Sequence, residues 1–294
     1  MSGTGRAVLA MMVATLLWGA TFIVVRDSLD GLSPAALVTA RFGAAALALA
    51  LIALARGRRP SRAALLGGGV GGLAAAGGYL FQAIGLTSTS AGSSAFLTST
   101  GTLFAALFAW PLLGQRPGGR LAVGLVVAMA GSALLGVRDG WRVSAGDLWT
   151  LLGAWCFALQ IVALARWAKQ GDAVVIAGIQ AAVAALCTLP AAGDLPGLLA
   201  RLDGAGWARL AYLTAMGSVV APLLQVWAQR TLSPGRIGLL FALEPVFALA
   251  LALGLGGERF VARWWAGAGL ILFSVVGVEW SEARNAATIP SSTA

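Results

Sequence analysis

Two ionisable side chains stand deep inside long apolar stretches of this sequence. Glu244 lies in LLFALEPVFALAL (239–251), directly before Pro245, and Arg41 lies in AALVTARFGAAALALA (35–50). At the centre of a membrane helix, either charge would cost about 2.5–3.5 kcal/mol on insertion scales. Two compensating arrangements remain open. The two side chains could pair with each other, or Arg41 could attract the carboxylate and Glu244 the ammonium of a zwitterionic substrate. A protonated Glu244 would instead be a candidate proton carrier.

Polar side chains also recur at helical spacing in other apolar stretches. The spacings of three and four residues place each set on one helix face: Tyr79 and Gln82; Ser94, Thr98 and Thr102; Ser218, Pro222, Gln225 and Gln229. Such faces could line a cavity. They could equally bond to neighbouring helices or to their own backbone.

Trp18 and Trp155 occupy similar places in LLWGATF (16–22) and LGAWCFA (152–158). Their rings could stack on an aromatic substrate or simply pack. The predicted substrate-binding residues are Trp18, Thr21, Arg41, Tyr79, Gln82, Thr98, Thr102, Trp155, Gln160, Gln225 and Glu244.

Several kinds of chemistry are missing from the sequence. There is no histidine, which removes histidine-activated nucleophiles, histidine metal sites and histidine proton relays. No GxxxxGK[ST] phosphate-binding loop is present, and no pair of intramembrane aspartates could act as an acid–base dyad. We therefore expect no enzyme activity, no metal and no cofactor.

The composition indicates a membrane protein. Of 294 residues, 59% are hydrophobic and only 11% are charged, whereas a soluble domain carries about 25% charged residues. The net charge of +9 resides in short hydrophilic gaps, so it predicts membrane topology and no nucleic-acid partner. Ten apolar stretches are long enough to cross a bilayer: 6–26, 33–55, 62–86, 90–113, 119–137, 144–168, 172–192, 206–230, 234–256 and 260–281.

Glycine and proline add a further expectation about helix shape. Gly67 and Gly71, like Gly68 and Gly72, have the small-xxx-small spacing of close helix contacts. Packing is the first interpretation, and a bend that opens a cavity is the second. Pro245 could likewise mark a break in its helix beside a cavity.

Basic residues predict the orientation. With the amino terminus inside, twelve of the twenty Lys and Arg residues fall on the inner side, chiefly through RGRRPSR (56–62). The positive-inside rule then places both termini in the cytoplasm.

The sequence repeats itself at an offset of 143 residues. FQAIGLTSTSAGSSAFLTSTGTLFAALFAWPLLGQR (81–116) aligns without a gap over LQVWAQRTLSPGRIGLLFALEPVFALALALGLGGER (224–259). Gln82 then meets Gln225, and Ser90 meets Ser233. Each half has five spans, an odd number, so the second half enters the membrane opposite to the first, as in carriers. The predicted organisation is one repeat over 1–140, an inverted repeat over 141–284 and a disordered tail over 285–294.

These stretches resemble a known family. LLWGATFIVVRDSLDGLSPAALVTARF (16–42) and the two aligned segments are similar to the EamA-type permeases of the drug/metabolite transporter superfamily, and most similar to YddG-type exporters of aromatic amino acids. The resemblance implies an all-α integral membrane protein with ten transmembrane helices around a central cavity, spans 5 and 10 being peripheral.

The resulting expectation is an exporter of small amphiphilic metabolites, aromatic or neutral amino acids, that works by alternating access in a bacterial inner membrane. The partners expected are the small-molecule substrate and the lipid bilayer; a monomer is plausible, and the oligomeric state stays open. A drug or organic-cation exporter is the alternative within transport. A lipid scramblase or a structural membrane subunit is the alternative from another class.

Overall fold

Helices account for nearly all of the secondary structure in the computed structural model, which describes residues 3–136, 143–254 and 263–288. The first five crossings are α1 (Gly3–Ser28), α2 (Pro34–Ala55), α3 (Arg62–Leu86), α4 with α5 (Ala91–Ser99 and Gly101–Leu113) and α6 (Gly119–Gly136). The next two are α7 (Ala145–Trp167) and α8 (Ala173–Thr188), the latter extended by the short 3-10 turn η1 (Leu189–Ala191). The last three are α10–η2–α11 (Gly204–Tyr212, Leu213–Val220 and Ala221–Ala228), α12 with α13 (Pro234–Phe241 and Glu244–Gly254) and α14 (Arg263–Thr288).

The predicted ten-span, all-helical fold is confirmed. Within the described part of the chain, nine of the crossings are long and apolar enough to span a bilayer, and α6 is a shorter apolar helix. One short helix, α9 (Leu195–Ala200), lies in the connection before α10 and was not predicted. The helix α14 continues through Thr288, so 285–288 are helical where a disordered tail was expected. Residues 289–294 of that tail lie outside the described residues.

Polar residues at the ends of the spans determine where the helices begin. Ser90 and Ser233, matched in the repeat, both cap a helix: each side chain accepts a hydrogen bond from the backbone N–H three residues later. Ser144 and Asp147 form a reciprocal capping box at the start of α7. Such caps satisfy backbone donors that would otherwise lack partners.

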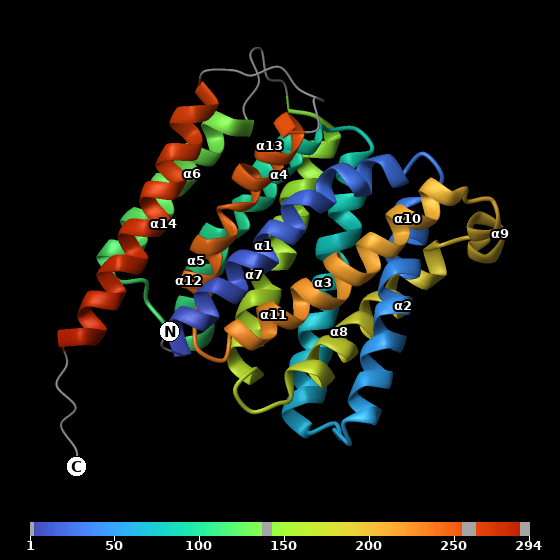
Figure 1. Cartoon of the computed structure of the whole chain (residues 1–294), viewed down its shortest axis with the longest axis horizontal. Helices are drawn as coiled ribbons and strands as arrows, with labels where there is room; N and C mark the ends of the chain where they lie inside the picture. Colours follow the sequence, from blue (N-terminus) through green and yellow to red (C-terminus); the bar gives the residue numbers. More distant parts are fainter. Residues whose placement is uncertain (1–2, 137–142, 255–262, 289–294) are drawn as a thin grey trace.

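The helix contacts follow the inverted repeat. The second helices of the two halves, α2 and α8, pack together, and so do the fifth, α6 and α14. The third helix of each half packs on the first helix of the other: α3 on α7, and α11 on α1. In Figure 1, α6 and α14 lie at one edge of the bundle and α2 with α10 lie at the other, while α1, α3 and α7 run between them.

The glycine-rich stretch of α3 serves close packing. The helix is unbroken from Arg62 to Leu86, so the glycines do not interrupt it. A Cβ at Gly68 would lie 2.6 Å from the Cβ of Ile179 on α8, and one at Gly78 would lie 2.5 Å from the ring of Phe157 on α7. The missing side chains let three helices approach one another where apolar attraction between helices is weak.

Two spans are broken at the same place in the repeat. The span of α4 and α5 is interrupted at Thr100, and that of α12 and α13 at Ala242 and Leu243. Thr100 and Leu243 are 143 residues apart, which is the repeat offset. The matched breaks therefore belong to the repeated design and not to one local irregularity.

Candidate functional site

A cavity lies among the central helices, at both helix breaks. Its volume is about 40 Å³. This space holds about three water molecules, since each water needs roughly 10–15 Å³ of such a cavity. The residues that line it are Trp18, Thr21, Tyr79, Gln82, Thr98, Gly101, Thr102, Phe157, Gln160, Ile161, Gln225, Phe241 and Glu244. This set includes every predicted substrate-binding residue except Arg41 and Trp155. The structure thus gathers in one place side chains that are up to 226 residues apart in the sequence.

The position of Glu244 explains the Glu-Pro pair. Glu244 is the first residue of α13 and Pro245 is the second. A helix N-terminus favours a carboxylate, and a proline there forfeits no helical hydrogen bond. Gly19 of α1 allows the close approach, since a Cβ there would lie 3.0 Å from the carbonyl oxygen of Glu244. The side chain is 5% exposed and lines the cavity.

The carboxyl group of Glu244 has no protein partner in the described part of the chain. No hydrogen bond or ion pair to its oxygens occurs among residues 3–136, 143–254 and 263–288. The cavity therefore presents one carboxyl group that a ligand could engage.

Aromatic rings form two walls of the cavity. The indole of Trp18 stacks on Phe241, with ring centroids 5.1 Å apart, and donates its N–H to the carbonyl oxygen of Gly217 at 3.0 Å. Tyr79 meets Phe157 edge-on, with centroids 4.9 Å apart. Both pairs have the centroid separations typical of favourable aromatic contacts.

Amide side chains form the polar part of the wall. Gln160 and Gln225 exchange two hydrogen bonds, and Gln160 also donates to the Oε1 of Gln180 at 3.0 Å. Gln82 donates to the Oγ1 of Thr98 at 3.1 Å. Gln82, Thr98, Gln160 and Gln225 line the cavity and also bond to neighbouring helices, whereas Gln180 lies outside the lining. A single polar side chain can therefore serve both the cavity wall and the packing between helices.

Arg41 lies behind Tyr79, outside the cavity lining. It is 2% exposed, and its Nε donates to the Oγ of Ser218 at 2.9 Å. Its guanidinium carbon sits 4.9 Å from the ring centroid of Tyr79 and 4.8 Å from that of Phe42. One terminal nitrogen has no hydrogen-bond partner in the described residues. No ion pair joins Arg41 to Glu244 among those residues.

A π-helical segment positions the partners of Arg41 and Trp18. In η2 (Leu213–Val220), the Ser218 hydroxyl donates to the carbonyl of Leu213, five residues back. The same segment presents the Gly217 carbonyl to Trp18 and the Ser218 oxygen to Arg41. Such wide turns are rare and occur often at functional sites.

Trp155 is placed elsewhere. Its side chain is 48% exposed and packs edge-on against Phe104 and Phe108, with centroids 5.3 and 6.1 Å away. The reason is helical geometry. Phe157 and Gln160, the cavity-lining residues of α7, lie two and five positions later, which is the opposite side of the helix at 3.6 residues per turn. The sequence similarity between the Trp18 and Trp155 segments therefore does not predict in which direction the Trp155 side chain points.

Four lining residues were absent from the predicted set: Gly101, Phe157, Ile161 and Phe241. Two of them had a signal in the sequence. Phe157 precedes Gln160, and Phe241 precedes Glu244, by three positions, a spacing that predicts a shared helix face. Phe157 and Gln160 lie on one continuous helix, whereas the break at Ala242 and Leu243 separates Phe241 from Glu244. Their residue type did not distinguish them, because most residues of this sequence are apolar.

Comparison with known proteins gives one family and several relatives. The model of the EamA-like transporter family matches residues 5–137 and again 144–280. An uncharacterized transporter of Archaeoglobus fulgidus is 27% identical over 268 residues, covering 91% of this chain and 84% of the relative. The uncharacterized inner membrane transporter YedA of Escherichia coli is 27% identical over 277 residues, covering 91% and 88%.

Two further comparisons bear on function and on fold. A probable terminal-alkyne amino-acid exporter of Streptantibioticus cattleyicolor is 30% identical over 158 residues, about half of each chain. A protein of known crystal structure superposes with a TM-score of 0.77, covering 95% of this chain and 98% of the other at 23% identity, a likeness of fold alone.

Proposed function

The chain belongs to the EamA-like transporter family, and on this premise we propose that it exports small neutral amino acids and related amphiphilic metabolites, those with aromatic side chains included. It is a multi-pass membrane protein. Its location is the bacterial inner membrane, where the relative YedA resides, with both termini in the cytoplasm. Transport proceeds by alternating access between the two inverted halves.

The observation that carries the proposal is the separation of two buried charges around an aromatic cavity. Glu244 lines the cavity without a protein partner, and Arg41 lies behind Tyr79 with one terminal nitrogen unsatisfied. Buried charges are costly unless they are paired. A zwitterionic amino acid would supply both missing partners, its ammonium to Glu244 and its carboxylate to Arg41.

The walls between these groups suit the rest of such a substrate. The rings of Trp18 and Phe241 and of Tyr79 and Phe157 provide apolar and aromatic contact area. An aromatic pair of this kind adds about 0.5–1.5 kcal/mol beyond the area it buries. An aromatic or aliphatic side chain therefore finds a matching surface, and Gln82 and Thr98 offer hydrogen bonds.

The cavity volume bears on the transport cycle. A space of about 40 Å³ does not admit an amino acid, since ligand sites usually measure about 300–1,000 Å³. The structure thus fits a contracted state, and the halves must move apart to bind substrate. Tyr79, which stands between the cavity and Arg41, must shift in the same step to let a carboxylate reach the guanidinium.

One specific observation favours a second candidate, an organic-cation exporter. Glu244 reaches the cavity whereas Arg41 does not, so a cation without a carboxylate would satisfy the group that is accessible in this state. A lipid scramblase fits less well. It needs a polar groove open to lipid, and the polar residues here surround an interior cavity.

The experiment is substrate counterflow in proteoliposomes that contain the purified full-length protein. The panel holds phenylalanine, leucine, phenethylamine, which lacks the carboxylate, and phenylpropionate, which lacks the ammonium. Exchange of the two amino acids, with little exchange of either truncated analogue, supports the proposal. Exchange of phenethylamine alone would establish the organic-cation alternative, and exchange of none of the four would contradict both.

A further inference from the structure

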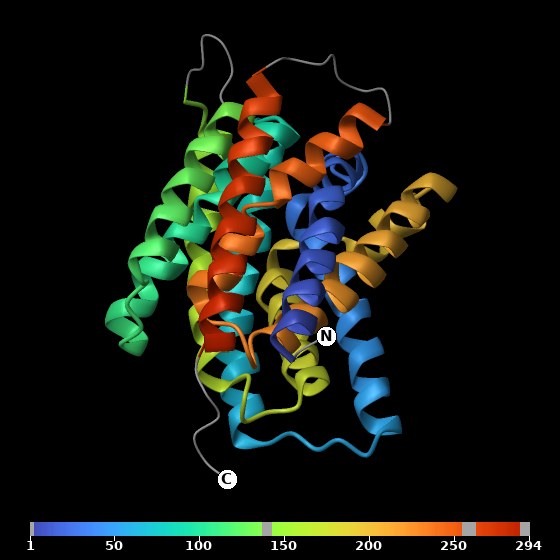
Figure 2. The ribbon, with the colours of Figure 1, turned by 60° about the vertical axis from the view of Figure 1, so that its left-hand side comes forward.

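A second hollow lies far from the cavity, on the outer surface of the bundle. It is a groove of about 800 Å³ between α6 and α14. The two helices lie at one edge of the molecule in Figure 1, and Figure 2 brings that edge, with α14 in red, toward the viewer. Its lining residues are Gly119, Arg120, Val123, Gly124, Val127, Phe273, Ser274, Gly277, Val278, Trp280, Ser281 and Arg284. They come from the first half of α6 and the last part of α14, which is the side of the bundle where both termini lie.

One end of the groove is basic. The Nη1 of Arg120 donates a hydrogen bond to the Oγ of Ser281 at 2.9 Å, which joins α6 to α14. The guanidinium carbon of Arg284 lies 5.0 Å from the ring centroid of Trp280. Both arginines and the tryptophan line the same mouth.

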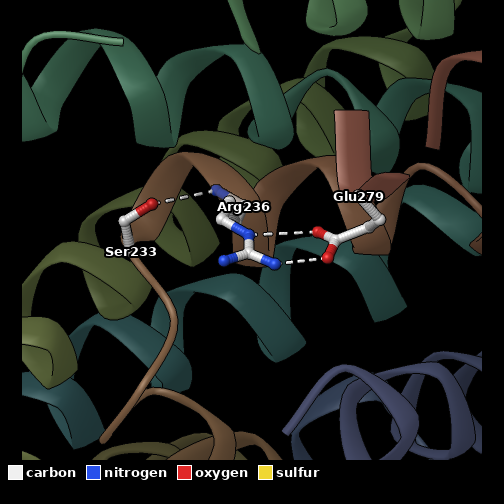
Figure 3. Close-up of polar contacts among 3 residues, drawn as sticks. All are labelled: Ser233, Arg236 and Glu279. Carbon is white, nitrogen blue, oxygen red and sulfur yellow. Dashed lines mark hydrogen bonds and ion pairs between the residues drawn. The ribbon is translucent and has the colours of Figure 1, made fainter. Parts of the chain in front are cut away.

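One acid of α14 close to the groove in sequence, Glu279, is paired with another helix. Glu279 accepts two hydrogen bonds from Arg236 of α12, one of them from Nε to Oε1 at 3.1 Å, and both side chains are largely shielded from solvent (Figure 3). Glu282, further along α14, does not line the groove. Glu279 is thus paired with Arg236, and the charged residues that line the groove are Arg120 and Arg284.

The remainder of the groove is apolar and open. Val123, Val127, Phe273 and Val278 line it, and Phe273 is 74% exposed. The floor includes Gly277, where a Cβ would meet no atom within 4 Å. The hollow therefore has a basic, tryptophan-flanked mouth at a membrane surface and an apolar channel that leads away from it.

We propose that this groove binds an anionic phospholipid of the surrounding bilayer. The phosphate lies between Arg120 and Arg284, and an acyl chain lies along Val123, Val127 and Phe273. Arginine suits phosphate because its planar guanidinium can donate two parallel hydrogen bonds. Tryptophan is favoured at headgroup depth, and basic pockets between membrane helices are known headgroup sites. The site uses no residue of the transport cavity.

The test measures lipid retention by native mass spectrometry of the purified full-length protein in detergent. The probes are phosphatidylglycerol, which is anionic, and phosphatidylcholine, which is zwitterionic, both with the same acyl chains. The wild type should hold one phosphatidylglycerol at least about fivefold more tightly than phosphatidylcholine. Arg120→Gln should lose about fivefold in phosphatidylglycerol affinity, the effect of roughly one cation near a membrane surface. Arg59→Gln, which removes the same charge from an exposed loop outside the groove, should lose nothing.

A second pair of variants tests the channel itself. Gly277→Leu should fill the groove and reduce retention of phosphatidylglycerol. Gly269→Leu is the matched control, because Gly269 lies two turns earlier on α14, has equally open space, and does not line the groove. Equal retention in all four variants and the wild type would overturn the proposal, since the lipid would then be non-specific annular lipid. Displacement of phosphatidylglycerol by inorganic phosphate at millimolar concentration would also overturn it, because the site would then recognise free anions and not a lipid.

Discussion

Gln160 on α7 and Gln225 on α11 exchange hydrogen bonds of 3.2 and 3.1 Å between their side-chain amides. The two residues are 65 positions apart and stand seven and three residues from the ends of their helices, at the side of the cavity nearer to the termini. They join the two helices across the cavity wall, and each satisfies the other in a buried position.

This pairing predicts a non-additive effect on stability. Gln160→Ala or Gln225→Ala should each cost about 1–3 kcal/mol, because each strands a buried amide. The double variant should cost clearly less than the sum, since no stranded partner of the pair remains. Thermal unfolding in detergent measures the three values, with Gln115→Ala, at an exposed position, as the control. Additive losses would show that the two amides do not depend on each other.

Much of the fold could be predicted because a membrane span is a matter of length and apolarity. The expected span 62–86 coincides with α3, and 33–55 with α2 to within one residue. The break before Glu244 was expected from Pro245, which is the second residue of α13. The matched break at Thr100 and the π-helix around Gly217 have no comparable local signal in the sequence. The polar cavity residues were readable because polar groups are costly in lipid. Trp155 was expected in the cavity and lies outside its lining. Its residue type could not decide this, because an aromatic side chain is tolerated on either side of a membrane helix.

Close packing of α3 predicts an asymmetry between neighbouring glycines. Gly68→Ala should lower stability by about 1–3 kcal/mol, because its Cβ would lie 2.6 Å from that of Ile179 and the helices must separate. Gly69→Ala should leave the unfolding midpoint unchanged or slightly higher, since nothing lies within 4 Å of a Cβ there. Equal midpoints for the two variants would contradict the packing role of the stretch.

The positions of Trp18 and Trp155 predict different effects on apparent substrate affinity. Trp18→Ala removes a ring of the cavity wall and should weaken apparent substrate affinity five- to tenfold, the effect of losing about 1 kcal/mol or slightly more. Trp155→Ala should leave affinity unchanged, because its ring faces away from the cavity. Counterflow at graded substrate concentrations measures both. An equal loss from the two substitutions would mean that neither tryptophan acts through the cavity.

The predicted orientation can be checked with single cysteines in a chain from which the free thiols Cys156 and Cys187 have been removed. Ser61, in the loop between α2 and α3, and Ala200, at the end of α9, are both exposed. In right-side-out vesicles, an impermeant maleimide should label a cysteine at position 200 directly and one at position 61 only after the membrane is opened. Labelling of both from the outside would refute the inverted topology.

We propose above that Arg41 and Glu244 serve the two poles of a zwitterionic substrate. The most direct measurement is counterflow of phenylalanine and phenethylamine by the wild type, Arg41→Gln and Glu244→Gln, with thermal unfolding confirming that each variant is folded. Arg41→Gln should lose at least about tenfold in phenylalanine exchange relative to the wild type while its phenethylamine exchange stays the same or rises, because only phenylalanine has a carboxylate. Glu244→Gln should lose exchange of both compounds. Equal losses of the two compounds in Arg41→Gln, or low stability of Glu244→Gln that Arg41→Met restores along with normal flux, would contradict the claim.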